Sequence, residues 1–484
     1  MKAILIVLLA GFHLVWAQAQ DFTRSSESIF YNVGGKIDTA DVDGDGDIDL
    51  FLSGHRRLVG PELMLYKNDG FGNFFRTSFG FPNLDNGSVD FADIDGDGDS
   101  DILLSGAVDR TNFVTYLYLN EGKEGFTRVP ETPLVGVVNG EASFADIDGD
   151  EDLDLVISGE VYSPILGINV FSLNLYLNNG SGGFEIIKTT TFNELEDGSP
   201  VIADVDGDMD LDLLVVGSST RLYLNDGTAS FSLSNVRLSD ARAGVAAFSD
   251  LDLDGDQDLI LVDTWYFTTY LYWNNGAGIF LEAPKSPFIN GVFGSISTGD
   301  VTGNSYPDVL ITGLTADGDA RTEAYLYIND GQGSFDVYGQ NIFWGSWLSS
   351  SLMADIDGDK DLDVIISGEL SPVQGEPAFN NTSLYLNNRL ITSLRKEHIN
   401  QLPYSIISDP YNKLLKISIE SEYSGQMDVQ IFDFQGRLMK EFQKGLVLGP
   451  QEITMMSVSL VPGNYLLRLS HQNLVGTKKF IIPR

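Results

Sequence analysis

An aspartate-rich stretch of nine residues recurs along the chain and constrains its fold more than any other feature. The copies begin at Asp41, Asp93, Asp146, Asp204, Asp250, Asp300 and Asp355, at intervals of 46 to 58 residues. The first copy reads DVDGDGDID, and only the Asp300 copy, DVTGNSYPD, departs far from it. Self-similarity at a period of about 50 residues indicates an array of similar structural units.

Each copy lies in the same local frame. An apolar run such as Leu50-Phe51-Leu52 follows it, and further on comes a Leu-Tyr-x-Asn motif, as in Leu117-Tyr118-Leu119-Asn120, with an Asn-Gly or Asp-Gly turn and a phenylalanine. Short runs rich in β-branched and aromatic residues, bounded by such turns, are typical of strands joined in hairpins. We therefore predict four antiparallel strands per repeat, which is one propeller blade, and seven blades in an all-β protein.

The two ends of the repeat region complement each other. The seventh repeat stops at Asn388 and lacks its last strand, whereas Phe22-Thr23-Arg24 matches Phe126-Thr127-Arg128, the last strand of the second repeat. We expect the N-terminal strand to complete the seventh blade and close the propeller, because a closed ring leaves no open sheet edge. An open solenoid is the alternative.

Alternating carboxylates around a glycine direct several oxygen atoms to one centre. We expect positions 1, 3, 5 and 9 of each copy to bind a cation through side chains, and position 7 through its backbone carbonyl. The candidate ligands in the first four copies are Asp41, Asp43, Asp45, Asp47, Asp49, Asp93, Asp95, Asp97, Asp99, Asp101, Asp146, Asp148, Asp150, Asp152, Asp154, Asp204, Asp206, Asp208, Asp210 and Asp212. Those in the last three copies are Asp250, Asp252, Asp254, Asp256, Asp258, Asp300, Thr302, Asn304, Tyr306, Asp308, Asp355, Asp357, Asp359, Asp361 and Asp363.

The residue types favour calcium. Clustered carboxylates repel one another and raise their own pKa values unless a cation lies between them. Ca²⁺ accepts about six to eight oxygen ligands in flexible geometry, whereas Mg²⁺ prefers a strict octahedron. Leu52, Leu104 and Ile157 stand where an EF-hand requires glutamate. We expect up to seven Ca²⁺ ions, one per blade. The alternative is that the loops are acidic turns without an ion, and this alternative is strongest for the Asp300 copy.

These motifs resemble a known family. The D-x-D-G-D-x-D-x-D loop, followed by an apolar strand and L-Y-L-N-x-G-x-G-x-F, is similar to the FG-GAP or VCBS repeats of integrin α-subunit propellers and many bacterial surface proteins. The resemblance covers residues 21–388 and implies a calcium-binding propeller. The resemblance does not identify a function, because the family includes adhesins, glycan binders and domains attached to enzymes.

The N-terminus indicates export. Lys2, an apolar run from Ala3 to Trp16 and the sequence Ala17-Gln18-Ala19 are typical of a secretory signal peptide, predicted over residues 1–19. No later apolar run is long enough for a transmembrane helix. The propeller is then predicted over residues 20–388.

A different domain follows a linker over residues 389–400. Strand-like alternation within residues 401–484 predicts a small antiparallel β-sandwich. Residues 431–437, 460–465 and 478–482 are similar to the C-terminal sorting domains of type IX secretion cargo in Bacteroidetes-like bacteria. The resemblance implies contact with the type IX secretion machinery and a secreted or outer cell-surface location.

Charge and composition exclude several partners and chemistries. The chain has 69 acidic and 29 basic residues, a net charge of −40, and no cysteine. Without Lys2 and the mildly basic segment from Arg389 onward, the propeller carries 61 acidic and 16 basic residues, a net charge of −45. Nucleic acid and anionic membranes would be repelled. The absence of cysteine excludes disulfides and thiolate chemistry.

Catalytic motifs are absent from the sequence. His55 is the only histidine of the predicted propeller, and no Ser/His/Asp set or phosphate-binding loop occurs. Acidic residues outside the loops are available for a glycosidase pair, but the sequence does not give their separation. Examples are Glu62, Glu160, Glu194 and Glu323. We therefore predict no catalytic residue.

Strand order predicts two unlike faces. The aspartate loops and Asn-Gly turns lie on one face, and the variable loops after the Ser-Gly motifs lie on the other. Candidate anchors on the variable face are His55, Arg56, Arg57, Arg110, Tyr162, Trp265, Tyr266, Phe267, Arg321 and Phe379. Trp265 to Phe267 are instead expected in a strand packed between blades, because few turn residues surround them.

The favoured hypothesis is an adhesion or ligand-binding module for a glycan or a surface protein, since aromatic and arginine side chains are common anchors. The alternatives are a polysaccharide lyase or hydrolase with its site on the variable face, and a structural surface-layer component.

Overall fold

The structure is a computed structural model in which the chain divides into two compact units, residues 1–389 and residues 390–484. It describes residues 22–25, 33–56, 60–77, 79–122, 125–187, 192, 195, 197–242, 244–289, 291–315, 322–339, 342–370, 379–388, 404–409, 414–421, 425–433, 438–446, 449–456, 463–471 and 474–482. The predicted signal peptide, the linker, Arg57, Glu194 and Arg321 lie outside the described residues, as do the side chains of His55, Arg56 and Phe379. Among the described residues, no helix has the length and apolar character needed to cross a membrane.

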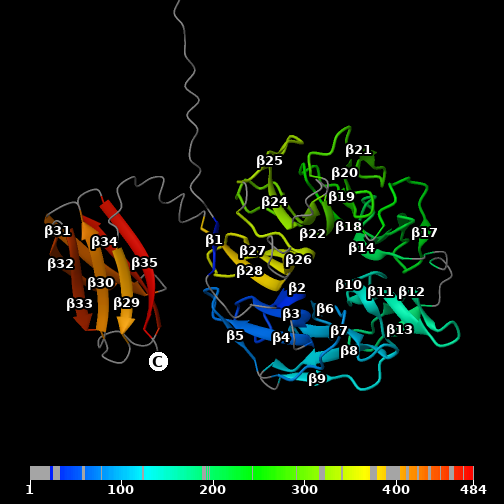
Figure 1. The fold of residues 1–484 in the computed structure, drawn as a ribbon, viewed down its shortest axis with the longest axis horizontal. Helices are drawn as coiled ribbons and strands as arrows, with labels where there is room; N and C mark the ends of the chain where they lie inside the picture. The colour runs from blue at the N-terminus through cyan, green and yellow to red at the C-terminus, as the bar shows by residue number, and fades with distance from the viewer. Residues whose placement is uncertain are drawn as a thin grey trace, which may run out of the picture. The chain divides into compact units, whose positions relative to one another are not determined.

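The described strands of the first unit form four-stranded antiparallel sheets, the blades of a propeller (Figure 1). Blade 1 contains β2 (Val33–Ala40), β3 (Asp49–Arg56), β4 (Gly60–Asn68) and β5 (Phe74–Arg76). Blade 2 contains β6 (Val89–Ala92), β7 (Asp101–Ala107), β8 (Phe113–Asn120) and β9 (Phe126–Arg128). Blade 3 contains β10 (Val138–Ala145), β11 (Asp154–Ser163), β12 (Ile168–Leu177) and β13 (Glu185–Ile187).

The remaining sheets follow the same order. Blade 4 contains β14 (Ser199–Ala203), β15 (Asp212–Val216), β16 (Arg221–Leu224) and β17 (Ser232–Leu233). Blade 5 contains β18 (Val245–Ser249), β19 (Asp258–Asp263), β20 (Thr268–Trp273) and β21 (Leu281–Glu282). Blade 6 contains β22 (Gly291–Gly299), β23 (Asp308–Thr315), β24 (Thr322–Asn329) and β25 (Phe335–Val337). Blade 7 contains β26 (Trp347–Ala354), β27 (Asp363–Leu370), β28 (Phe379–Asn387) and, as its outer strand, β1 (Phe22–Arg24).

Burial explains why the second strand of each blade is a continuous apolar run. Leu50, Phe51 and Leu52 of β3 are successive residues, so their side chains point to opposite faces of the sheet, and each is at most 1% exposed. Both faces of the blade are therefore covered by neighbouring blades. Alternating polar residues, which suit a sheet with one wet face, would leave buried polar groups here.

The core consists of apolar clusters that each join two adjacent blades. One cluster contains Leu103 of blade 2 and Leu155 of blade 3, and equivalent clusters join the other successive blades. A further cluster joins Leu50 of blade 1 to Ile365 of blade 7. β1 pairs with β28 over its three residues, and Phe22 is 4% exposed in the cluster between blades 6 and 7. The predicted propeller fold is confirmed.

The C-terminal unit has two antiparallel sheets. One contains β29 (Tyr404–Asp409), β30 (Leu414–Ser421) and β33 (Gly449–Met456). The other contains β32 (Leu438–Leu446), β31 (Gly425–Asp433), β34 (Gly463–His471) and β35 (Leu474–Ile482). Alternate residues of the central strands are buried, for example Met427, Val429 and Ile431 of β31, which gives each sheet one apolar face. This agrees with the predicted β-sandwich.

Candidate functional site

The aspartate loops connect the first and second strands of each blade and fold around the residue at position 1. In the first loop, Asp41 Oδ1 accepts a hydrogen bond from the Gly44 amide (2.8 Å), and Oδ2 accepts one from the Gly46 amide (2.8 Å). Both glycines have a positive φ, 70° and 89°, which is the left-handed conformation that glycine adopts without steric cost. The loop therefore turns its backbone amides toward a carboxylate and leaves the neighbouring carboxylates close together.

Several loops keep this conformation without glycine. Glu151, Met209, Ser305 and Lys360 occupy position 6 with φ between 73° and 78°, and Leu253 occupies position 4 with φ of 60°. A non-glycine residue in this region costs about 1–3 kcal/mol, so the rest of the loop must hold it there. The strain shows that the loop conformation is imposed by its polar groups rather than by local backbone preference.

Position 9 fastens each loop to its blade. Asp49 is 1% exposed; its Oδ2 accepts a hydrogen bond from the Val42 amide (3.1 Å), and its Oδ1 accepts one from the Asn68 amide (2.7 Å). Burial raises the pKa of Asp49 to about 6, and burial raises that of Asp363, its counterpart in blade 7, to about 8. These carboxylates lie in surroundings that disfavour an unneutralised negative charge.

The asparagine of each Leu-Tyr-x-Asn motif joins two blades. Its side-chain amide donates to the backbone carbonyl at position 2 of the preceding blade's loop, over 2.7 to 2.9 Å. The pairs are Asn68 and Ile356, Asn120 and Val42, Asn178 and Ile94, Asn225 and Ile147, Asn274 and Val205, Asn329 and Leu251, and Asn387 and Val301. We call this set the asparagine ring. It ties the loops to one another around the loop face.

Carboxylates of at least five loops gather closely enough to bind one cation, with ligand atoms within 4.8 Å of one another. Five such groups are Asp41, Asp43 and Asp45; Asp93, Asp95 and Asp101; Asp146, Asp148 and Asp154; Asp204, Asp206 and Asp212; and Asp250, Asp252 and Asp254. In four of them a buried oxygen has no hydrogen-bond partner, and these oxygens are the Oδ1 atoms of Asp95, Asp148, Asp206 and Asp250. Burial, followed by repulsion from Asp97, raises the pKa of Asp95. Oxygen-only donor sets with such orphaned atoms fit a hard divalent cation.

Position 7 lies at the edge of these groups. A side chain at Gly70, in the Asp-Gly turn of blade 1, would collide with the carboxylate of Asp47, and the same holds for Gly180 and Asp152 in blade 3. The turn glycine thus lets the turn close over the loop. This contact also places the turns and the aspartate loops on one face, as predicted from strand order.

The sixth loop does not fit a cation in the same way. It has carboxylates only at Asp300 and Asp308, and Asn304 donates its side-chain amide to the backbone carbonyl of Asn329 (2.8 Å). The Thr302 amide donates to Asp308 Oδ2 (3.1 Å), and the Tyr306 ring covers Gly331. Direct hydrogen bonds hold the loop conformation here, where the other loops present converging carboxylates.

Comparison with family models agrees with this loop geometry. A model described as an FG-GAP-like repeat matches residues 41–104, 204–261, 250–311 and 300–366. The propeller contains FG-GAP-like repeats. A model described as a secretion system C-terminal sorting domain matches residues 408–483. The sorting domain implies export through the type IX secretion system, to the cell surface or the outside, and contact with its machinery.

Two solved structures are distantly similar to this chain. The subtype N11 neuraminidase-like protein of the flat-faced bat strain H18N11 from Peru is 11% identical, with 76% of this chain and 93% of that chain covered and a TM-score of 0.33. The Aspergillus kawachii β-fructofuranosidase is 9% identical, with 94% and 89% covered and a TM-score of 0.28. A search of curated proteins found no match.

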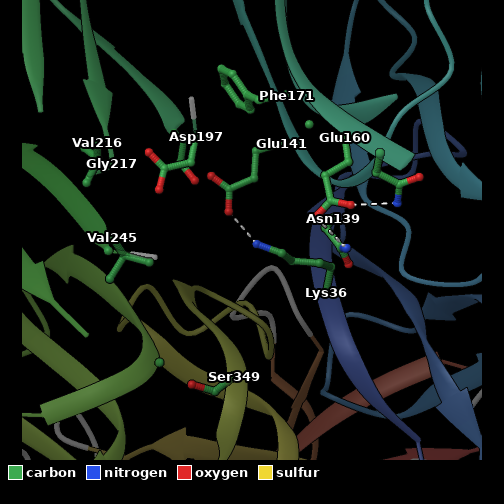
Figure 2. Close-up of a pocket in the computed structure, with 16 residues that line it drawn as sticks. Lys36, Asn139, Glu141, Glu160, Phe171, Asp197, Val216, Gly217, Val245 and Ser349 are labelled. Atoms are coloured by element: carbon green, nitrogen blue, oxygen red, sulfur yellow. Dashed lines mark hydrogen bonds and ion pairs between the residues drawn. The ribbon is translucent and has the colours of Figure 1, made fainter. Parts of the chain in front are cut away.

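The FG-GAP-like propeller has a cavity of about 660 Å³ at the inner strands of its blades. Figure 2 shows Lys36 of blade 1, Glu141 of blade 3 and Asp197, which precedes blade 4, around this cavity. Lys36 Nζ and Glu141 Oε1 form a 2.7 Å ion pair, with both side chains partly exposed. The Glu141 carboxylate raises the pKa of Lys36, and Lys36 lowers that of Glu141. Sequence reasoning missed both residues, although each lies five residues before its aspartate loop.

Of the three candidate glycosidase acids that the structure describes, Glu62, Glu160 and Glu323, it is Glu160 that lines this cavity. Its Oε2 accepts a hydrogen bond from Asn169 (2.8 Å), and its Oε1 accepts a longer one from Asn139 (3.4 Å). Asp197 also lines the cavity, and its Oδ1 accepts hydrogen bonds from the Ser218 hydroxyl (2.6 Å) and backbone amide (2.8 Å). Each carboxylate is therefore held in place by neutral donors.

The prediction that Trp265 to Phe267 lie in a buried strand is wrong. They form the turn between β19 and β20, and Trp265 and Tyr266 are 60% and 72% exposed. Asp263, which is buried, caps the turn by accepting hydrogen bonds from the Trp265 and Tyr266 amides (2.8 and 3.1 Å), and Phe267 has a φ of 58°. The turn therefore presents two aromatic rings on the variable face.

Proposed function

We propose that the exported chain is a calcium-stabilised ligand-binding module, and that its ligand, a glycan or a surface protein, binds the variable face. The observation that carries this proposal is that the two faces of the propeller present different groups. The loop face is occupied by converging carboxylates and by the asparagine ring, which hold blades together. The variable face has an open cavity and exposed aromatic rings instead.

Calcium is the cation that suits the loops best. Six of the seven loops supply carboxylates at all five alternate positions, which are Asp41 to Asp49 in the first loop, and oxygen ligands alone are typical of Ca²⁺ sites. The role is structural: an ion that binds only the folded loop stabilises the folded chain by mass action. Bound ions would also offset part of the propeller's net charge of −45.

A binding role is favoured over catalysis by the state of the cavity carboxylates. Glu141 is paired with Lys36, and Glu160 and Asp197 accept hydrogen bonds from neighbouring amides or hydroxyls. A general acid needs a carboxyl group that stays protonated near neutral pH, whereas the Lys36 ammonium lowers the pKa of Glu141. The cavity is thus better suited to recognising a ligand than to protonating one.

A pair of matched variants tests which face binds. Val245→Trp places a large side chain in the cavity, and Ile279→Trp makes the same change in the exposed turn of blade 5 on the loop face. Binding of the purified mature chain to a glycan array and to labelled surface proteins is measured with Ca²⁺ present. We expect Val245→Trp alone to abolish binding. Equal loss in both variants, or release of product from a bound polysaccharide, would contradict the proposal.

A further inference from the structure

The polar groups of the central cavity alternate between donors and acceptors. Going around its wall, the Asn139 and Asn169 amides flank the Glu160 carboxylate, and the Lys36 ammonium stands beside the Glu141 carboxylate. A hydroxyl group donates and accepts at the same time, so adjacent hydroxyls of a sugar ring can use an amide and a carboxylate together. An ammonium ligand would use only the acceptors, and an anion only the donors.

An apolar wall lies next to these groups. Phe171 of β12 pairs directly with Glu160 of β11 across the hairpin, so that its ring and the carboxylate share one side of the cavity (Figure 2). The C–H face of a sugar ring is apolar and packs against an aromatic ring, while its hydroxyls reach polar groups at the edge. The pairing of Glu160 with Phe171 supplies both kinds of contact from adjacent strands.

The backbone on one side is specialised for this cavity. Asn139 has a φ of 51° and lies in a β-bulge where β10 shifts its pairing with β11, between Val138 and Glu141. Bulges re-aim side chains, and strained residues concentrate at functional sites. Asn139 and Glu141, on either side of Gly140 in this irregular segment, both line the cavity.

The opposite side is left open by glycine. Gly198, Gly217, Gly244 and Gly294 line the cavity, and a side chain at Gly294 would collide with the backbone carbonyl of Thr312. These positions cannot acquire side chains that fill the space. The volume of about 660 Å³ lies within the range of about 300–1,000 Å³ that is usual for small-molecule sites.

We propose that the cavity binds a sugar residue of an uncharged glycan, with Phe171 against the ring and Glu160, Asn169 and Asp197 at its hydroxyls. The inference rests on the proposed ligand-binding function and narrows its ligand to one class. Uronic acids and sulfated sugars are excluded by charge, since the lining has one ammonium, of Lys36, against the carboxylates of Glu141, Glu160 and Asp197.

The test uses the mature chain with Ca²⁺ and two sets of probes. Neutral oligosaccharides of glucose, galactose and mannose are compared with oligogalacturonate and a sulfated glycosaminoglycan, on an array and then by titration calorimetry. Phe171→Ala and Glu160→Gln are the test variants. Phe75→Ala and Glu185→Gln, at exposed positions outside the cavity, are their matched controls. Thermal melting in Ca²⁺ checks that every variant is folded.

We expect a neutral oligosaccharide to bind, and each test variant to weaken its Kd by about tenfold, the size of one lost hydrogen bond or ring contact. The controls should stay within about twofold. The inference would be overturned if the chain preferred the acidic probes, or if both test variants bound a neutral oligosaccharide as tightly as the wild type does. If no glycan binds but a surface protein does and Val245→Trp blocks it, the inference fails while the proposed function stands. If nothing binds, both fail.

Discussion

The asparagine ring makes a quantitative prediction at the contact between blades 1 and 2. Asn120 is 2% exposed, and its side-chain amide donates to the Val42 carbonyl (2.9 Å) and the Ser100 carbonyl (3.1 Å). Its side-chain oxygen accepts a hydrogen bond from the Gly122 amide (3.1 Å). Replacing Asn120 with alanine removes all three bonds at once.

The expected cost follows from these contacts. A hydrogen bond within a protein contributes about 1 kcal/mol net, and a buried group left without a partner costs about 1–3 kcal/mol. Three lost bonds give about 3 kcal/mol for Asn120→Ala, and the cost rises above this because the Val42 and Ser100 carbonyls lose this donor. At that size the change lowers the Tm of the propeller by several degrees, since a large domain shifts by about 2–4 °C for each kcal/mol.

Thermal and urea unfolding, followed by tryptophan fluorescence in saturating Ca²⁺, measure this loss. Asn235→Ala, at an exposed position, is the control and should change stability by less than about 0.5 kcal/mol. Asn68→Ala removes the bond to Ile356, which joins blade 1 to blade 7, and should cost as much as Asn120→Ala. A loss below about 1 kcal/mol in both variants would refute the view that this ring fastens the blades.

Three further predictions concern the cations and the inner strands. Chelation should lower the Tm, because a ligand at a hundredfold excess over its Kd stabilises the folded chain by about 2.7 kcal/mol per site. Ca²⁺ should restore the Tm better than Mg²⁺, and an unchanged Tm argues against bound calcium. Native mass spectrometry should count six Ca²⁺ ions in the wild type and five in Asp208→Asn. Asn304→Asp, in the sixth loop, should destabilise the chain without adding an ion. A seventh ion would contradict our interpretation of the sixth loop. Burial raises the pKa of Asp38 to about 6, so the folded state holds this proton more tightly than the unfolded state, and the resulting stability is present below about pH 4 and lost as the pH rises through 6. Asp38→Asn should therefore gain up to about 3 kcal/mol over the wild type between pH 4 and pH 8 in denaturant titrations; a pH-independent difference would count against the buried charge.

The blades could be predicted from the sequence because each contains its own signals. The apolar run from Leu50 to Leu52, the Leu-Tyr-x-Asn motif and the Asn-Gly turn are local features, and they specify strands and hairpins without reference to the rest of the chain. The same is true of the aspartate loops, whose ligands lie within nine residues. Even the β1 pairing was predictable, because Phe22-Thr23-Arg24 matches the outer strand of another repeat.

The cavity could not be predicted, because it is assembled from residues far apart in the chain. Lys36 and Glu141 are 105 residues apart and meet only when blades 1 and 3 are placed around a common centre. The prediction for the Trp265 turn was wrong for a different reason. It contains no glycine, proline or asparagine; a buried aspartate, Asp263, forms the turn, and Phe267 accepts a conformation that its own sequence does not favour.

The pairing of β1 with β28 has a consequence for the order of events during export. Phe22 pairs with Asn387, so the first strand of the propeller to leave the ribosome has no partner until nearly all of its blades have followed. Contacts of such long sequence separation form late and slowly. A chain interrupted before blade 7 would keep an unpaired sheet edge, which makes partial products poor candidates for a stable folded state and favours delivery of the whole repeat region before folding is completed.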